Sequence, residues 1–235
     1  MSPWEWSCYV VLPILGIFGH YLGLWTAPDA YRRIFFSEQG LIELGTAAFY
    51  GVAACVAVTL SFKARELVPK RYRVLYLLFA LSALFVALEE ISYGQHLFGW
   101  ETPQWFSERN VQQEINLHNL FGSKPNRVLS DLAHFVFPVG FIVLPGLVVL
   151  RRGQYTPDHW AYYILPRGQL ITVVILAGLL RVLRKLPSSA LTGSNLGLTE
   201  LMEFYWATAI LLYVVVMWRR LISSDWRLLH ELDCH

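Results

Sequence analysis

The chain has 235 residues, of which 55% are hydrophobic and only 15% carry a charge. A soluble domain has roughly 25% charged residues, so this composition predicts an integral membrane protein. The net charge of +2 is small and no basic tract with interleaved aromatics appears, which argues against nucleic acid as a partner. Three widely spaced cysteines give neither a disulfide framework nor a metal knuckle.

Six apolar stretches have about the length needed to cross a bilayer, which takes roughly 20 residues for a helix. They predict spans near residues 9–25, 41–62, 74–93, 129–150, 170–186 and 198–221. The tryptophan-rich polar segment 94–128 is expected to be interfacial or re-entrant, because tryptophan prefers that depth. We therefore predict one all-α polytopic domain over residues 1–235, without a soluble domain or an internal repeat.

Basic residues set the predicted orientation. They gather at 63–73, 151–167 and 219–227, so the positive-inside rule puts both termini in the cytoplasm, as we expect for a protein of the bacterial inner (cytoplasmic) membrane. The basic residues at 32–33 and 181–185 oppose this assignment. Glu5 precedes the first apolar run and no cleavage site follows it, so we expect a retained span rather than a signal peptide.

Ionisable residues that are unusual in a span fall at one end of the predicted bundle. Because consecutive spans alternate in direction, residues late in odd spans and early in even spans share a membrane face. These residues are His20, Glu43, Glu89, Glu90, Asp131, His134, Arg181, Arg184, Glu200 and Glu203. Since an intramembrane charge is by default a candidate for function, we predict a polar cavity at this end, opening at the outer leaflet.

Acidic residues and histidines in this region have spacings that suit a metal site. Glu114 and His118 are four residues apart, and residues three or four apart share a helix face. Carboxylates and imidazoles from several helices build metal sites in bundles, and they suit zinc, iron or manganese. The predicted ligands are Glu114, His118, His134 and Glu203, within a polar cluster that adds Glu43, Glu89, His96, Asn116, Asn119 and Glu200. The alternative is a structural plug in which these groups pair with one another.

The candidates for acid/base chemistry or metal ligation are Glu90, His118, Asp131 and His134. Arg181 and Arg184 are candidates for holding an anionic headgroup, because guanidinium groups bind phosphate in a bidentate manner. The alternative, of equal weight, is that they neutralise nearby glutamates. The sequence has no nucleophile elbow, P-loop or dinucleotide motif. Ser92 lies near candidate bases, which keeps Ser-His-Glu hydrolysis as an alternative.

Two segments, EEISYGQHLFGWETP and NVQQEINLHNL, carry a resemblance. They resemble a family of multi-pass bacterial membrane proteins with E-E-[IV]-S-[WY]-G-Q and N-L-H-N segments, and this resemblance implies no particular activity. The serine, aspartate and histidines near one face are also similar in arrangement to the alkaline ceramidase and adiponectin receptor group of membrane zinc hydrolases. That group has seven spans, and its motifs do not align with this chain.

We expect a membrane-embedded enzyme, with a divalent metal as a candidate cofactor, that hydrolyses or transfers a group on a lipid or lipid-linked substrate. The first alternative is a non-catalytic subunit that binds partner proteins of a membrane complex, or holds haem or a pigment through His20 or His134. The second alternative is a transporter or proton relay that uses the intramembrane carboxylates.

Overall fold

The computed structural model describes residues 3–36, 40–63, 68–110, 112–117, 120, 135–150, 158–166, 168–184 and 197–222. Regular structure in these residues is helical apart from one β-bridge between Asn110 and Leu120, which confirms the all-α prediction. Five of the described helices are long and apolar enough to cross a membrane: Pro3–Thr26, Leu41–Lys63, Lys70–Glu90, Trp160–Arg184 and Leu198–Leu221. The fourth predicted span, 129–150, appears as a shorter apolar helix, Phe135–Leu150, and residues 129–134 lie outside the described part.

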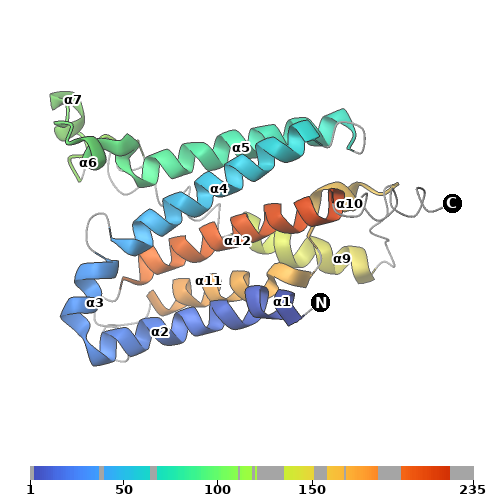
Figure 1. The fold of residues 1–235 in the computed structure, drawn as a ribbon, viewed down its shortest axis with the longest axis horizontal. Helices are drawn as coiled ribbons and strands as arrows, with labels where there is room; N and C mark the ends of the chain where they lie inside the picture. Colours follow the sequence, from blue (N-terminus) through green and yellow to red (C-terminus); the bar gives the residue numbers. More distant parts are fainter. Residues whose placement is uncertain are drawn as a thin grey trace.

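Helix α12 (Leu198–Leu221) lies at the centre of the bundle. In its apolar stretch 61% of residues are buried, against 17% in the N-terminal helix Pro3–Thr26. Helix α4 (Leu41–Lys63) packs along both α12 and α5 (Lys70–Glu90), and α11 (Ile171–Arg184) packs against α12 as well (Figure 1). The membrane-facing helices therefore surround one apolar core built on α12.

The N-terminal span is held against α12 by a close approach. It consists of α1 (Pro3–Trp6), a π-helical turn (Ser7–Val11) and α2 (Leu12–Thr26), and α3 (Pro28–Phe35) follows it. The hydroxyl of Tyr205 on α12 donates to the carbonyl oxygen of Pro13. A Cβ atom on Gly16 would lie 2.7 Å from that hydroxyl oxygen, so glycine is what allows the contact.

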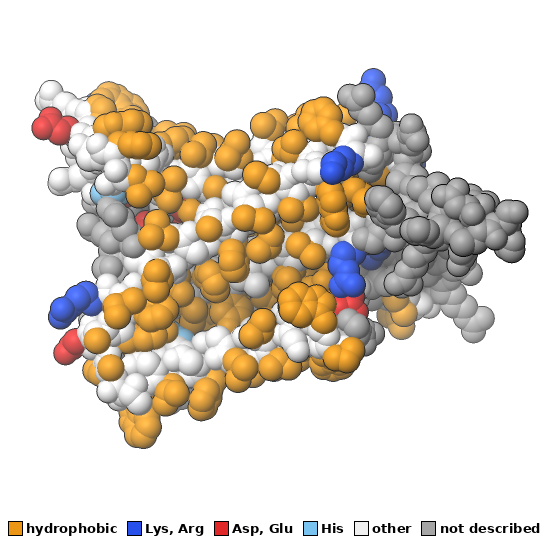
Figure 2. All heavy atoms as spheres, in the orientation of Figure 1, with side chains coloured by type: hydrophobic (Ala, Val, Ile, Leu, Met, Phe, Trp, Pro, Cys, Tyr) orange, Lys and Arg blue, Asp and Glu red, His pale blue; other side chains and the backbone are white. Residues whose placement is uncertain are grey.

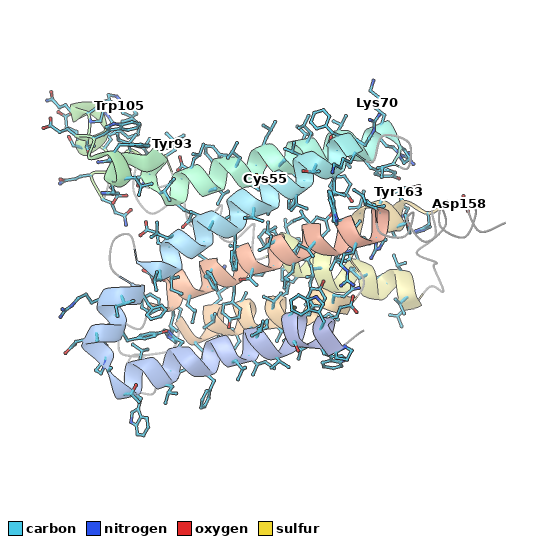
Figure 3. The ribbon with its side chains drawn as sticks, viewed as in Figure 1. Cys55, Lys70, Tyr93, Trp105, Asp158 and Tyr163 are labelled. Atoms are coloured by element: carbon cyan, nitrogen blue, oxygen red, sulfur yellow. The ribbon has the colours of Figure 1, made fainter. Side chains whose placement is uncertain are left out.

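The bundle has two distinct ends, which we call the acidic end and the basic end (Figure 1). The acidic end contains α3, the start of α4, the end of α5 and the start of α12. The basic end contains Lys63 at the end of α4, Lys70 and Arg71 at the start of α5, and Arg219 at the end of α12. Tyr93 and Trp105 lie at the first end and Lys70 and Asp158 at the second (Figure 3). Hydrophobic side chains cover much of the face between the two ends that Figure 2 shows.

Helix α5 ends at Glu90, three residues before the predicted limit of 93. The cause is a left-handed turn, in which Ser92, Tyr93 and Gly94 have φ angles of +46°, +53° and +82°. An L side chain rarely adopts this conformation, and no α-helix can continue through it. Two short helices follow, α6 (Gln95–Phe98) and α7 (Gln104–Ser107), which lie beyond the end of α5 (Figure 1).

Candidate functional site at the acidic end

The acidic end contains two polar groups that meet at the adjacent residues Glu89 and Glu90. One helix turn takes 3.6 residues, so neighbouring side chains point about 100° apart. Glu89 is 5% exposed and joins a hydrogen-bonded network, which we call the interlock. Glu90 is half-buried and faces other carboxylates, which together we call the carboxylate group.

Glu114 is the main acceptor of the interlock. Its Oε2 accepts from the Ser92 hydroxyl at 2.6 Å and from Nδ2 of Asn116 at 2.9 Å. Its Oε1 lies 2.9 Å from Nε2 of His96. The Glu114 side chain is 14% exposed and that of His96 is 30% exposed, so this contact is partly shielded from bulk solvent. Glu114 thereby fixes three side chains from two separate segments.

Amides continue the interlock on its other side. Nδ2 of Asn110 donates to both the backbone oxygen and Oδ1 of Asn116, at 2.8 and 2.7 Å. Oδ1 of Asn110 accepts from the backbone N–H of Gln112 at 2.9 Å. Asn116 is 1% exposed and Asn110 is 4% exposed, so these bonds satisfy amides that water does not reach.

Two further side chains tie the segment around residue 115 to the end of α5. Oε1 of Gln95 accepts from the backbone N–H of Ile115 at 2.6 Å, and its Nε2 donates to the Thr102 hydroxyl at 2.6 Å. Oε2 of Glu89 accepts from the backbone N–H of Leu117 at 2.8 Å. Burial, followed by a hydrogen bond to Glu89, raises the pKa of Tyr93 from 10.0 to about 12.

The interlock explains the left-handed turn at Ser92–Gly94. Left-handed backbone at a residue other than glycine costs of order 1–3 kcal/mol and persists only where surrounding contacts impose it. The Ser92 and Gln95 side chains, on either side of Tyr93 and Gly94, both bind the segment around Glu114 and Ile115. These bonds offset the backbone strain and aim the chain away from α5.

Ser92 does not have the arrangement of a nucleophilic serine. In a serine triad the imidazole lies between the serine and the carboxylate. Here the order differs, because Ser92 and His96 both bind the carboxylate of Glu114. Ser92 is also 2% exposed. The Ser-His-Glu alternative therefore finds no support in the geometry of these residues.

The carboxylate group comprises Glu43 in the first turn of α4, Glu90 in the last turn of α5 and Glu203 near the start of α12. Glu90 interacts electrostatically with both Glu203 and Glu43. Within the described residues, Glu90 and Glu203 make no hydrogen bond. Three carboxylates from three helices thus lie close enough at the end of the membrane-spanning region to interact electrostatically.

Arg184, one of the two predicted arginines, lies beside this group rather than within the interlock. Arg184, in the last turn of α11, interacts electrostatically with Glu203, and its Nη1 donates to the Thr199 hydroxyl at 3.2 Å. Arg184 and Glu200 are exposed, whereas Arg181 is half-buried. Arg184 therefore offsets part of the negative charge of Glu203 while its side chain stays accessible.

The predicted metal ligands are divided by the fold. Glu114 belongs to the interlock and Glu203 to the carboxylate group. Among the residues that the structure describes, no group of three or more His, Cys, Asp or Glu side chains is placed to hold a metal ion. His118, Asn119, Asp131 and His134 lie outside the described residues. The metal set, and the acid/base roles of those residues, stay predictions.

His20 lies at the acidic end but in a third environment. Its ring is 1% exposed and makes edge contacts with Tyr21, Tyr31 and Phe36. The Tyr31 hydroxyl lies 3.3 Å from its Nδ1. The described neighbours of the imidazole are therefore mainly aromatic rings, and haem or pigment binding through His20 stays a prediction.

Three interlock residues, Gln95, Thr102 and Asn110, were not singled out from the sequence. Their partners are 6 to 20 residues away along the chain. The signal in the sequence that could have identified them is their place in the two segments quoted above, 89–103 and 110–120. The interlock joins these two segments to each other.

No family model, curated protein or solved structure matches this chain.

Proposed function

We propose that this protein is a membrane-embedded enzyme that hydrolyses or transfers a group on a lipid or lipid-linked substrate at the acidic end. The observation that carries the proposal is the meeting of Glu43, Glu90 and Glu203 from three helices without hydrogen-bond partners for Glu90 and Glu203 among the described residues. Intramembrane carboxylates are expensive, and those that are not locked into a structural network are retained for function.

Neighbouring carboxylates of like charge cannot all ionise easily, so they share protons. In the proposed reaction, ionised Glu203 takes a proton from the attacking water or hydroxyl group. Protonated Glu90 gives a proton to the leaving oxygen. This division between acid and base is the one that paired carboxylates adopt in hydrolytic enzymes.

The substrate class follows from the position of the group. Glu90 closes the last turn of α5, where a span meets the headgroup layer. The exposed guanidinium of Arg184 lies near Glu203 and suits a phosphate or carboxylate. Exposed Leu97, Phe98 and Trp100 on the adjoining segment suit the membrane interface. These features favour a lipid with an anionic headgroup.

The test uses purified protein reconstituted in vesicles of mixed bacterial phospholipids and lipid-linked precursors, with products identified by mass spectrometry. The wild type is expected to change at least one lipid. The E90Q variant is expected to lose the activity, and E101Q, at an exposed glutamate of the adjoining segment, is expected to keep it. Equal lipid profiles for wild type and E90Q would count against the proposal.

A proton relay is the second candidate, and one observation favours it. The charged neighbours that act on Glu90 are all carboxylates: Glu203, Glu43 and Glu89. Such a row suits proton transfer between sites. Vesicles that contain the protein and a pH-sensitive dye would then acidify under an imposed potential, and E90Q would abolish this flux without any change in the lipids.

A further inference from the structure

We propose that a groove between α4 and α12 binds one acyl chain of an anionic phospholipid, whose headgroup is held by Lys63 at the basic end. The groove has a volume of about 570 Å³. It is lined by Ala48, Gly51, Val52, Cys55, Val56, Thr59, Val215 and Trp218. This site lies away from the carboxylate group and does not depend on the proposed function.

The wall of the groove is mostly apolar. Gly51 is one of its lining residues, and a Cβ atom placed there would meet no atom within 4 Å. The one hydroxyl on the wall, that of Thr59, donates to the carbonyl oxygen of Cys55 at 2.7 Å. It therefore leaves no unsatisfied donor in the groove, and a hydrocarbon chain can lie there without burying a polar group.

The length of the groove suits one acyl chain of a single leaflet. From Ala48 to Thr59 the groove follows α4 for roughly 16 Å, which is about half of a bilayer core. One acyl chain of a phospholipid spans one leaflet, so the groove can hold a chain along this length.

The charge at one end of the groove identifies the kind of lipid. Lys63 ends α4, and its Nζ lies 6.0 Å from the centre of the Trp218 ring, which lines the groove. Lipid tails are as apolar as the groove wall, so tail packing alone discriminates poorly between lipids. A cation at headgroup level adds attraction for an anionic lipid. In the proposed complex, the Trp218 ring contacts the headgroup end of the acyl chain and the Lys63 ammonium group binds the phosphate.

Native mass spectrometry of the full chain, purified and titrated with phosphatidylglycerol or phosphatidylcholine, tests this proposal. Wild type is expected to retain one phosphatidylglycerol in preference to phosphatidylcholine. In the K63Q variant this preference should be about fivefold weaker, because one basic residue near the membrane surface provides about that factor. K70Q, at another exposed lysine of the basic end, should keep the preference.

The groove itself is tested by filling it. G51L should abolish the retained lipid, whereas G178L on α11, where an added Cβ also meets no atom within 4 Å, should retain it. Equal retention by these two variants overturns the proposal, as does a K63Q preference equal to wild type. A variant whose only cysteine is Cys55 should stay monomeric under oxidation in membranes, because Cys55 faces a lipid. Rapid dimer formation would instead make a second copy the occupant and overturn the proposal.

Discussion

The interlock and the carboxylate group are built at the same end of the bundle, but their polar atoms are satisfied in different ways. In the interlock, Glu114 accepts from Ser92 and Asn116 and pairs with His96. In the carboxylate group, the charged neighbours of Glu90 are all carboxylates, whereas Glu203 has Glu200, Arg184 and Glu43 as charged neighbours. The interlock is a hydrogen-bonded network that joins two segments, whereas the carboxylate group is the part for which we propose a chemical role.

The difference also shows why composition alone does not locate a site. Both groups consist of glutamates near the end of a span, and both are costly to bury. A buried network with every partner present is rigid and stabilises a unique structure. Carboxylates that face one another keep titratable protons, which is the property that acid/base chemistry requires. The changes below are expected to affect the two groups in opposite ways.

The largest effect is expected for E90Q and E203Q. Each should lower the rate of lipid turnover by about 10²–10⁴-fold, the usual contribution of a general acid or base. The double variant should lose little more than either single variant, because residues that act as a unit are not additive. Reconstituted vesicles and product analysis measure these rates. Independent, multiplying losses would mean that the two carboxylates do not share one reaction.

Replacement of Glu114 by alanine should lower the free energy of unfolding by about 3 kcal/mol. Three hydrogen-bonded side chains would lose their acceptor, at roughly 1 kcal/mol each. Denaturant unfolding in detergent micelles measures the loss, with E108A, at an exposed glutamate, as the control. An E114A protein as stable as E108A would show that the interlock does not hold the segment in place.

The left-handed turn gives a smaller effect. G94A should lose about 1–2 kcal/mol, because its φ of +82° disfavours an L side chain and the new Cβ would lie 2.9 Å from the Phe98 ring. G99A, with φ of +65° and open space around the Cβ, should lose the backbone part alone. Unfolding curves of the two variants separate the steric cost from the conformational cost. Wild-type stability in both would contradict the turn as described.

The smallest effect is a dependence on pH at Tyr93. Burial, with a hydrogen bond to Glu89, raises its pKa from 10.0 to about 12. The neutral hydroxyl therefore stabilises the folded protein below pH 10, and this contribution is lost as the pH rises through about 12. Unfolding of the wild type should become easier over that range than unfolding of Y93F. Parallel pH curves for the two proteins would exclude this contribution.

Much of the fold could be predicted from hydropathy. The predicted spans 41–62 and 198–221 agree with helices Leu41–Lys63 and Leu198–Leu221. Alternation of the spans also placed Glu43, Glu90 and Glu203 at one end, as observed. These features depend on local composition and on the direction of successive helices, both of which the sequence carries directly.

The partition of the acidic end could not be predicted in this way. Nothing in the local sequence shows that Glu89 would bind the backbone of Leu117, 28 residues away, while Glu90 would face α4 and α12. The early end of α5 could not be predicted either, because the turn at Ser92 is imposed by its hydrogen bond to Glu114. The prediction of a span to residue 93 assumed that the helix continues, whereas tertiary contacts end it at Glu90.

Glu89 and Glu90 offer the most direct test of this division, since they are adjacent and chemically identical. Stability of E89A and E90A should be measured by denaturant unfolding under the same detergent conditions. E89A is expected to lose about 1–3 kcal/mol, because the Leu117 N–H and the Tyr93 hydroxyl lose their acceptor. E90A is expected to equal or exceed wild type, because it removes one of several facing carboxylates. A loss in E90A as large as that in E89A would contradict the separation of the two groups.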